Sequence, residues 1–127
     1  MRMISGLFGA LILVIGIVSC GGSDTTGTAT CPANTFCMGS TTFFLADGTT
    51  TLSVAANTAV MWTNNSATAH NVTFDDPATA LAAGTGNGGN FAAPVSSTNQ
   101  RKFAVSGSSH PFHCTIHPGM SGTVTVQ

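Results

Sequence analysis

Soft side chains gather near the end of the chain, in "HPFHCTIHPGM" (residues 110–120). Cys114 is followed three residues later by His117 and three residues after that by Met120. A short loop with this spacing can bend a thiolate, an imidazole and a thioether towards one point. These donor types predict a metal site that needs one further ligand.

The fourth ligand is expected from another strand, and His70 is the best candidate. Within "HNVTFDDP" (residues 70–77), His70 shares the face of Val72 and Phe74, which alternation directs inward. Two imidazoles and a thiolate in one plane, with a distant Met sulfur, form the donor set of electron-transfer copper. Zinc prefers four strong ligands near tetrahedral geometry, and a thioether suits it poorly. Copper is therefore the favoured metal.

Other soft side chains near this motif have ordinary interpretations. His113 flanks Cys114, and strand alternation turns it to the opposite face, so we expect it not to bind metal. His110 has the right parity but lies where the strand begins, and we interpret it as a partly exposed packing residue. For Met120 the alternative is a core gap filler, since Met adapts to irregular spaces.

Short alternating patterns separated by turn residues predict an antiparallel β-sandwich or barrel. Asn tolerates positive φ, so a turn is expected at Ala56 and Asn57. We interpret "GTGNGGNFAAP" (residues 84–94) as a surface loop and "PATALAA" (residues 77–83) as a possible site of one short helical turn. The inward pairs outside residues 70–77 are Leu52 and Val54, Val60 and Trp62, Phe103 and Val105, and Val124 and Val126.

The N-terminus is typical of an export signal. Arg2 precedes an apolar run over residues 7–18, which is too short to span a bilayer comfortably. The segment "IVSC" (residues 17–20) resembles a bacterial lipobox, so residues 1–19 are predicted to be a lipoprotein signal peptide and Cys20 the lipidated mature N-terminus. An ordinary secreted protein cut nearby is the alternative. We expect an exported protein, lipid-anchored on the periplasmic or cell-surface side of a membrane.

Residues 20–40 are predicted to form a lipidated, flexible tether ahead of the folded domain at residues 41–127. Their first part, "GGSDTTGTAT", has no large apolar residue to bury. Cys31 and Cys37 follow, and in an exported protein such a pair most simply forms a disulfide. Two free thiols or a second metal site remain open alternatives.

Two longer segments carry a family resemblance. "VMWTNNSATAHNVTF" (residues 60–74) and "FHCTIHPGMSGTVTV" (residues 112–126) resemble the two copper-ligand segments of the plastocyanin-like cupredoxins. The short interval between His117 and Met120 is more similar to amicyanin than to plastocyanin. The resemblance implies a Greek-key β-sandwich or barrel of roughly seven to eight strands. It also implies one type 1 copper per chain, with the ligands His70, Cys114, His117 and Met120.

The resemblance implies roles for three neighbours of the ligands. Asn71 should tie its strand to the Thr115 region by hydrogen bonding. Pro118 lacks an N–H, which removes one possible donor near the thiolate. These residues would tune the copper without binding it. The ring edge of His117 is expected to be exposed among apolar residues that could form a weak docking surface: Pro111, Phe112, Ile116, Pro118 and Gly119.

Composition and site chemistry together narrow the function. Only three residues are Lys or Arg, so no basic surface is available for nucleic acid. Four committed ligands leave no open position for a substrate, so we expect no enzyme activity. We predict a monomeric, membrane-tethered one-electron carrier between redox proteins. The alternatives are a copper carrier or chaperone that delivers copper to an exported enzyme, and a metal-free structural sandwich.

Overall fold

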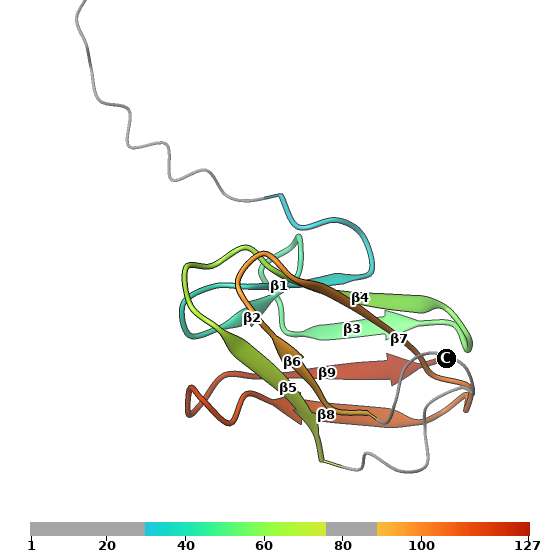
Figure 1. The fold of residues 1–127 in the computed structure, drawn as a ribbon. Helices are drawn as coiled ribbons and strands as arrows, with labels where there is room; N and C mark the ends of the chain where they lie inside the picture. The colour runs from blue at the N-terminus through green and yellow to red at the C-terminus, as the bar shows by residue number, and fades with distance from the viewer. Residues whose placement is uncertain (1–29, 76–88) are drawn as a thin grey trace, which may run out of the picture.

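The structure is a computed structural model that describes residues 30–75 and 89–127 (Figure 1). Over these residues the chain forms nine β-strands and no helix. No helix long and apolar enough to cross a membrane occurs in the described part of the chain. The predicted signal peptide, the lipidated Cys20 and the helical turn at residues 77–83 lie outside the described residues.

The strands form two sheets that stack as a β-sandwich, which confirms the predicted fold class (Figure 1). The first sheet has the order β2-β1-β4-β7, with β1 (Thr35–Met38), β2 (Phe43–Phe44), β4 (Ala59–Asn64) and β7 (Thr98–Lys102). The second has the order β3-β9-β8-β5-β6, with β3 (Thr51–Val54), β5 (His70–Phe74), β6 (Phe91–Ala93), β8 (Ser109–His113) and β9 (Ser121–Val126). The strand number exceeds the seven to eight expected because short edge strands are included.

Not all pairings are antiparallel, contrary to the sequence-based expectation. β1 pairs with β4 in parallel, with Phe36 opposite Trp62. β3 pairs with β9 in parallel, with Leu52 opposite Val124. Neither pair is consecutive in the chain, so no tight hairpin turn fixes the strand direction. Between β2 and β4 the chain passes through β3 in the other sheet, and this crossing lets β4 return parallel to β1.

Alternation predicted the buried faces of β4, β5 and β9 correctly, since every second residue of each is buried. The turn before β4 is also confirmed, with Asn57 at a φ of 63°.

Trp62 is fully buried at the centre of the aromatic core. Its ring stacks on Phe36 at 5.6 Å and meets Phe112 edge-on at 5.4 Å. Behind Phe112, a Cβ on Gly122 would lie only 2.6 Å from the ring, so this position needs glycine.

Two strand predictions were wrong. Phe103 and Val105 do not share a buried face: β7 ends at Lys102, and Val105 is 52% exposed in the link to β8. Residues 91–93, predicted as part of a surface loop, form β6 beside β5, and the Phe91 ring packs 5.5 Å from Trp62. A three-residue strand behind a run of Gly and Asn is too short to show alternation.

The folded domain begins before the predicted boundary at residue 41. β1 lies between β2 and β4, and all four of its residues are buried. A strand buried on both faces shows no alternation, and four residues are too few for a recognisable pattern. The second half of the predicted tether is therefore part of the sandwich.

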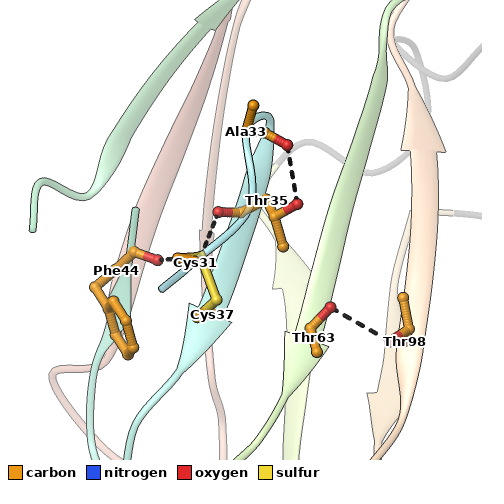
Figure 2. Close-up of a disulfide and its surroundings, with 7 residues drawn as sticks. All are labelled: Cys31, Ala33, Thr35, Cys37, Phe44, Thr63 and Thr98. Atoms are coloured by element: carbon orange, nitrogen blue, oxygen red, sulfur yellow. Dashed lines mark hydrogen bonds between the residues drawn. A yellow bond between two sulfur atoms is a disulfide. The ribbon is translucent and has the colours of Figure 1, made fainter. Parts of the chain in front are cut away.

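The disulfide between Cys31 and Cys37 is confirmed, with a Cα–Cα distance of 5.8 Å and both residues buried (Figure 2). It closes a short loop over the start of β1. Cys31 Sγ lies 2.9 Å from the carbonyl oxygen of Thr35. Because a disulfide sulfur carries no hydrogen, this is a close contact and not a hydrogen bond. The bridge fixes the point at which the chain enters the sandwich.

Replacing both Cys31 and Cys37 with Ala should lower the free energy of unfolding by about 2 kcal/mol, because the closed loop is short and restricts the unfolded chain only moderately. Urea denaturation followed by Trp fluorescence measures the change. The control is the unaltered protein under reducing conditions, which should lose a similar amount. An unchanged urea midpoint would contradict a stabilising role for the bridge.

Candidate metal centre

Three predicted ligands converge at one end of the sandwich. The Nδ1 atoms of His70 and His117 lie 3.9 Å and 3.8 Å from Cys114 Sγ. The potential ligand atoms of the three side chains all lie within 4.8 Å of one another. His70 and Cys114 are buried, with 2% and 3% of their surface exposed, whereas His117 is half-buried.

These separations fit a metal ion. In a trigonal plane, bonds of about 2.0 Å to nitrogen and about 2.3 Å to sulfur place each nitrogen about 3.7 Å from the sulfur. The observed distances of 3.9 Å and 3.8 Å are close to this spacing. Two imidazoles and one thiolate in this arrangement suit copper. The chain can therefore hold the predicted ion without rearrangement of these three side chains.

Strand pairing places His70 beside Cys114. His70 is the first residue of β5, and Cys114 follows the last residue of β8. These strands are antiparallel, with Thr73 opposite His113 and Phe74 opposite Phe112. The start of β5 and the end of β8 consequently meet at the same end of the sheet.

The loop after Cys114 is closed by backbone hydrogen bonds. Cys114 N donates to Met120 O at 2.9 Å, and Met120 N donates to His117 O at 3.2 Å. Gly119 occupies the left-handed region, at a φ of 86°, which lets the loop turn sharply. The loop thus brings Met120, three residues after His117, back into the core, where it is 1% exposed.

Asn71 joins the two ligand segments. Its Nδ2 donates to Thr115 Oγ1 at 2.6 Å, and its Oδ1 accepts from Thr115 N at 2.8 Å. Both ends of one amide are therefore used to hold the residue after Cys114. Pro118 lies exposed on the loop next to His117.

The two remaining histidines lie outside this cluster. His113 points to the opposite face, where its Nδ1 lies 2.8 Å from Asp75 Oδ1. His110 was predicted to be partly exposed, and this was wrong: it is 3% exposed. Its ring stacks on Phe103 with centroids 4.8 Å apart, because the segment after β7 folds over the start of β8.

A group of polar residues behind His70 was not predicted from the sequence. His70 Nε2 lies 3.0 Å from Ser66 Oγ and 3.2 Å from Thr68 Oγ1. Asn64, which is fully buried, contacts both of these residues. Asn64 continues the inward parity of Val60 and Trp62, and a polar residue at such a position was the available signal.

Burial lowers the pKa of His70 below its usual value of 6.5, and the nearby His117 lowers it further. A hydrogen bond from the ring to the backbone carbonyl oxygen of Gly39 opposes these effects in part. The neutral imidazole is the form that binds metal. The surroundings of His70 therefore favour its neutral form, which can bind metal.

Comparison with known proteins agrees with the site. Residues 38–127 match the family model described as copper binding proteins of the plastocyanin/azurin family. No curated protein matches the chain well enough to count as a relative. Because the family model covers most of the chain, the protein belongs to the plastocyanin/azurin family of copper-binding proteins.

Solved structures with a similar fold include several amicyanins. Amicyanin from Paracoccus versutus (Thiobacillus versutus) is 23% identical, with a TM-score of 0.54, over 78% of this chain and 87% of that chain. A mutant amicyanin in its reduced state is 23% identical, with a TM-score of 0.52, over 73% of this chain and 80% of that chain. At such identities the likeness shows the fold alone. Members of this family bind one type 1 copper and carry electrons, and they are not enzymes. The site in this chain combines the cluster of His70, Cys114 and His117 with Met120, which is buried at the end of the same loop.

The lowered pKa of His70 predicts a pH dependence for the copper-free protein. Below about 6.5 the unfolded chain takes up a proton at this residue while the folded chain does not. The free energy of unfolding should therefore be highest above pH 6.5 and fall as the pH is lowered towards the folded-state pKa, by at most about 1.4 kcal/mol per pH unit. Urea denaturation at several pH values measures this slope.

The matched control is His70→Gln, which should remove this part of the slope. Asp47 also has a lowered pKa, caused by hydrogen bonds from Thr49, but it acts below its usual value of 3.8 and does not interfere. An equal slope in the His70→Gln protein would contradict the assignment. NMR titration of the His70 ring gives the folded-state pKa directly.

Proposed function

We propose that this protein is an exported, lipid-anchored one-electron carrier, with His70, Cys114, His117 and Met120 as copper ligands. The observation that carries the proposal is a buried thiol held between two imidazole nitrogens at 3.8 Å and 3.9 Å. When bound, copper supplies the one-electron couple between Cu(II) and Cu(I). The donor and the acceptor are other redox proteins.

The residues around the ligands limit movement during electron transfer. Asn71 fixes Thr115 with two hydrogen bonds, and the loop closes back on Cys114 through Met120. Burial of Cys114 excludes water from the thiolate. Because these contacts hold the ligands in one geometry, the ligands would move little when the copper gains or loses an electron.

His117 offers the path by which electrons enter and leave. It is the half-buried member of the cluster, whereas His70 is 2% exposed. Next to it lie exposed apolar residues, including Ile116, which is 53% exposed, and Pro118. An apolar surface of this kind suits brief, weak docking of a redox partner.

Copper delivery is less well supported than electron transfer. Metal exchange needs ligands that an acceptor protein can reach one after another. His70, Cys114 and Met120 are each no more than 3% exposed, which favours a retained ion.

Membrane attachment is the further part of the proposal. The lipobox-like segment before Cys20 supports lipidation, and residues 21–30 would serve as the link to the domain. The disulfide between Cys31 and Cys37 supports an oxidising location outside the cytoplasm. The anchor would keep the carrier beside membrane-bound redox proteins, on the periplasmic or cell-surface side.

The copper(II)-loaded protein should show intense visible absorption from thiolate-to-copper charge transfer, together with the EPR spectrum of a type 1 site. Cys114→Ser should abolish the absorption, because the thiolate is its source. Met120→Leu should retain the absorption and raise the reduction potential, because the weak axial sulfur is lost. Visible and EPR spectroscopy with redox titration measure these changes.

Absorption that survives Cys114→Ser would refute the ligand assignment. A matched control is His113→Gln, since His113 lies on the opposite face, and this variant should keep the absorption. Rapid loss of copper to a modest chelator would instead favour copper delivery over electron transfer.

Cys20→Ser should move the protein from the membrane fraction to the soluble fraction, because it removes the acceptor of the acyl chains. Each buried methylene contributes about 0.8 kcal/mol to membrane binding, so the shift should be nearly complete. Cell fractionation and mass spectrometry of the mature N-terminus measure it. Ser23→Ala is the control and should stay membrane-bound. A Cys20→Ser protein that still sediments with membranes would argue against lipid anchoring.

A further inference from the structure

A chain of polar contacts leads from the core to the outer nitrogen of His70. Its inner end is Asn64, the last residue of β4, which is fully buried. Asn64 Nδ2 donates to Thr68 O and to Ala93 O, both at 2.8 Å. Both amide hydrogens are therefore used, and Oδ1 faces Ser66.

The orientation of the Asn64 amide follows from these partners. Oδ1 accepts from Ser66 N at 3.0 Å and lies 2.7 Å from Ser66 Oγ. A flipped amide would place an NH₂ group against the Ser66 N–H and an oxygen against two carbonyl oxygens. Carbonyl oxygens cannot donate, so only the unflipped amide satisfies all four contacts.

Ser66 has a single hydroxyl hydrogen, and its neighbours determine where it points. Asn64 Oδ1 at 2.7 Å and Thr68 O at 3.0 Å are both pure acceptors. An O···O distance of 2.7 Å is that of a hydrogen bond and requires a hydrogen between the atoms. With its hydrogen used there, Ser66 Oγ can only accept from His70 Nε2, which lies 3.0 Å away.

We infer that Asn64, acting through Ser66, holds His70 in the tautomer that carries its hydrogen on Nε2. The other ring nitrogen, Nδ1, then has a free lone pair where it faces Cys114 Sγ at 3.9 Å. Asn64 and Ser66 are positioning residues for the copper site, and the inference rests on the function proposed above. A neutral ring with its hydrogen on Nδ1 would point an N–H at the copper position and could not bind.

Two other groups near the ring can accept a hydrogen bond from it. Thr68 Oγ1, 3.2 Å from His70 Nε2, is a second hydroxyl oxygen able to accept. The backbone hydrogen bond at Gly39 raises the pKa of the ring, so it runs from a ring N–H to the Gly39 carbonyl oxygen. Ser66 differs from Thr68 because its contact with Asn64 leaves it no hydrogen to donate. Hydrogen-bonded neighbours of this kind orient metal-binding histidines and raise their basicity, and their loss typically reduces metal affinity about 10–100-fold.

The deciding experiment compares Ser66→Ala and the double variant Ser66→Ala/Thr68→Val with the unaltered full chain. Ring ¹⁵N NMR of the copper-free protein, at a pH well above 6.5 so that His70 is neutral, reports the tautomer directly. The unaltered protein should show about a tenfold or larger excess of the form with hydrogen on Nε2. The double variant should show a mixture of both forms, with Ser66→Ala between the two proteins.

The copper-loaded proteins give a second readout. Copper(II) affinity should fall about 10–100-fold in the double variant. A tenfold loss for copper(II) relative to copper(I) raises the potential by about 59 mV. Ser66→Thr, which keeps the hydroxyl, should restore the tautomer and the potential. Ser53→Ala is the matched control, since it removes a hydroxyl bonded to Thr125 Oγ1 at 2.7 Å in the β3–β9 pair.

The inference is overturned if His70 carries its hydrogen on Nδ1 in the unaltered protein. It is also overturned if the tautomer of the double variant matches that of the Ser53→Ala protein. Failure of the proposed function gives a different result, because the unaltered copper-loaded protein would then lack thiolate-to-copper absorption whatever the tautomer of His70.

Discussion

The antiparallel pairing of β5 with β8 sets the distance between the two halves of the metal centre. In the observed register Thr73 lies opposite His113, and this places the start of β5 beside Cys114, the residue that follows β8. A slip by one residue would turn His70 from the core to the surface, because side chains alternate between faces. The buried Val72 and Phe74 on the same strand hold that register, since the slip would expose them as well. The copper site therefore depends on the apolar core for its geometry.

Around this pairing, hydrogen bonds restrict each ligand from a different direction. Asn71 holds the segment after Cys114, and the backbone contact from Cys114 to Met120 closes the ligand loop. Behind His70, Asn64 and Ser66 order the polar contacts of the ring. The exposed side of the site is left to His117 and its apolar neighbours. The buried ligands are therefore held rigidly, whereas the loop that carries His117 is the accessible part of the site.

Sequence reasoning was most reliable where one face of a strand is buried and the other is not. Alternation identified the inward faces of β4, β5 and β9, and positive φ at Asn57 was correctly expected. It failed for β1, whose residues are buried on both faces, and for β6, which is too short to alternate. The parallel direction of β1 and β4 was not predicted either, because β4 pairs with β1 only after the chain has passed through the other sheet.

The sequence by itself determined the chemistry of the site. Thiolate, imidazole and thioether donors at Cys114, His117 and Met120 are close in the chain, so their spacing alone limits the metal they suit. Only the tertiary structure decided which groups surround His70, how far His117 is exposed and where His110 is buried. These properties depend on contacts between segments far apart in the chain. Residue spacing does not encode such contacts, because they arise only when the two sheets pack together.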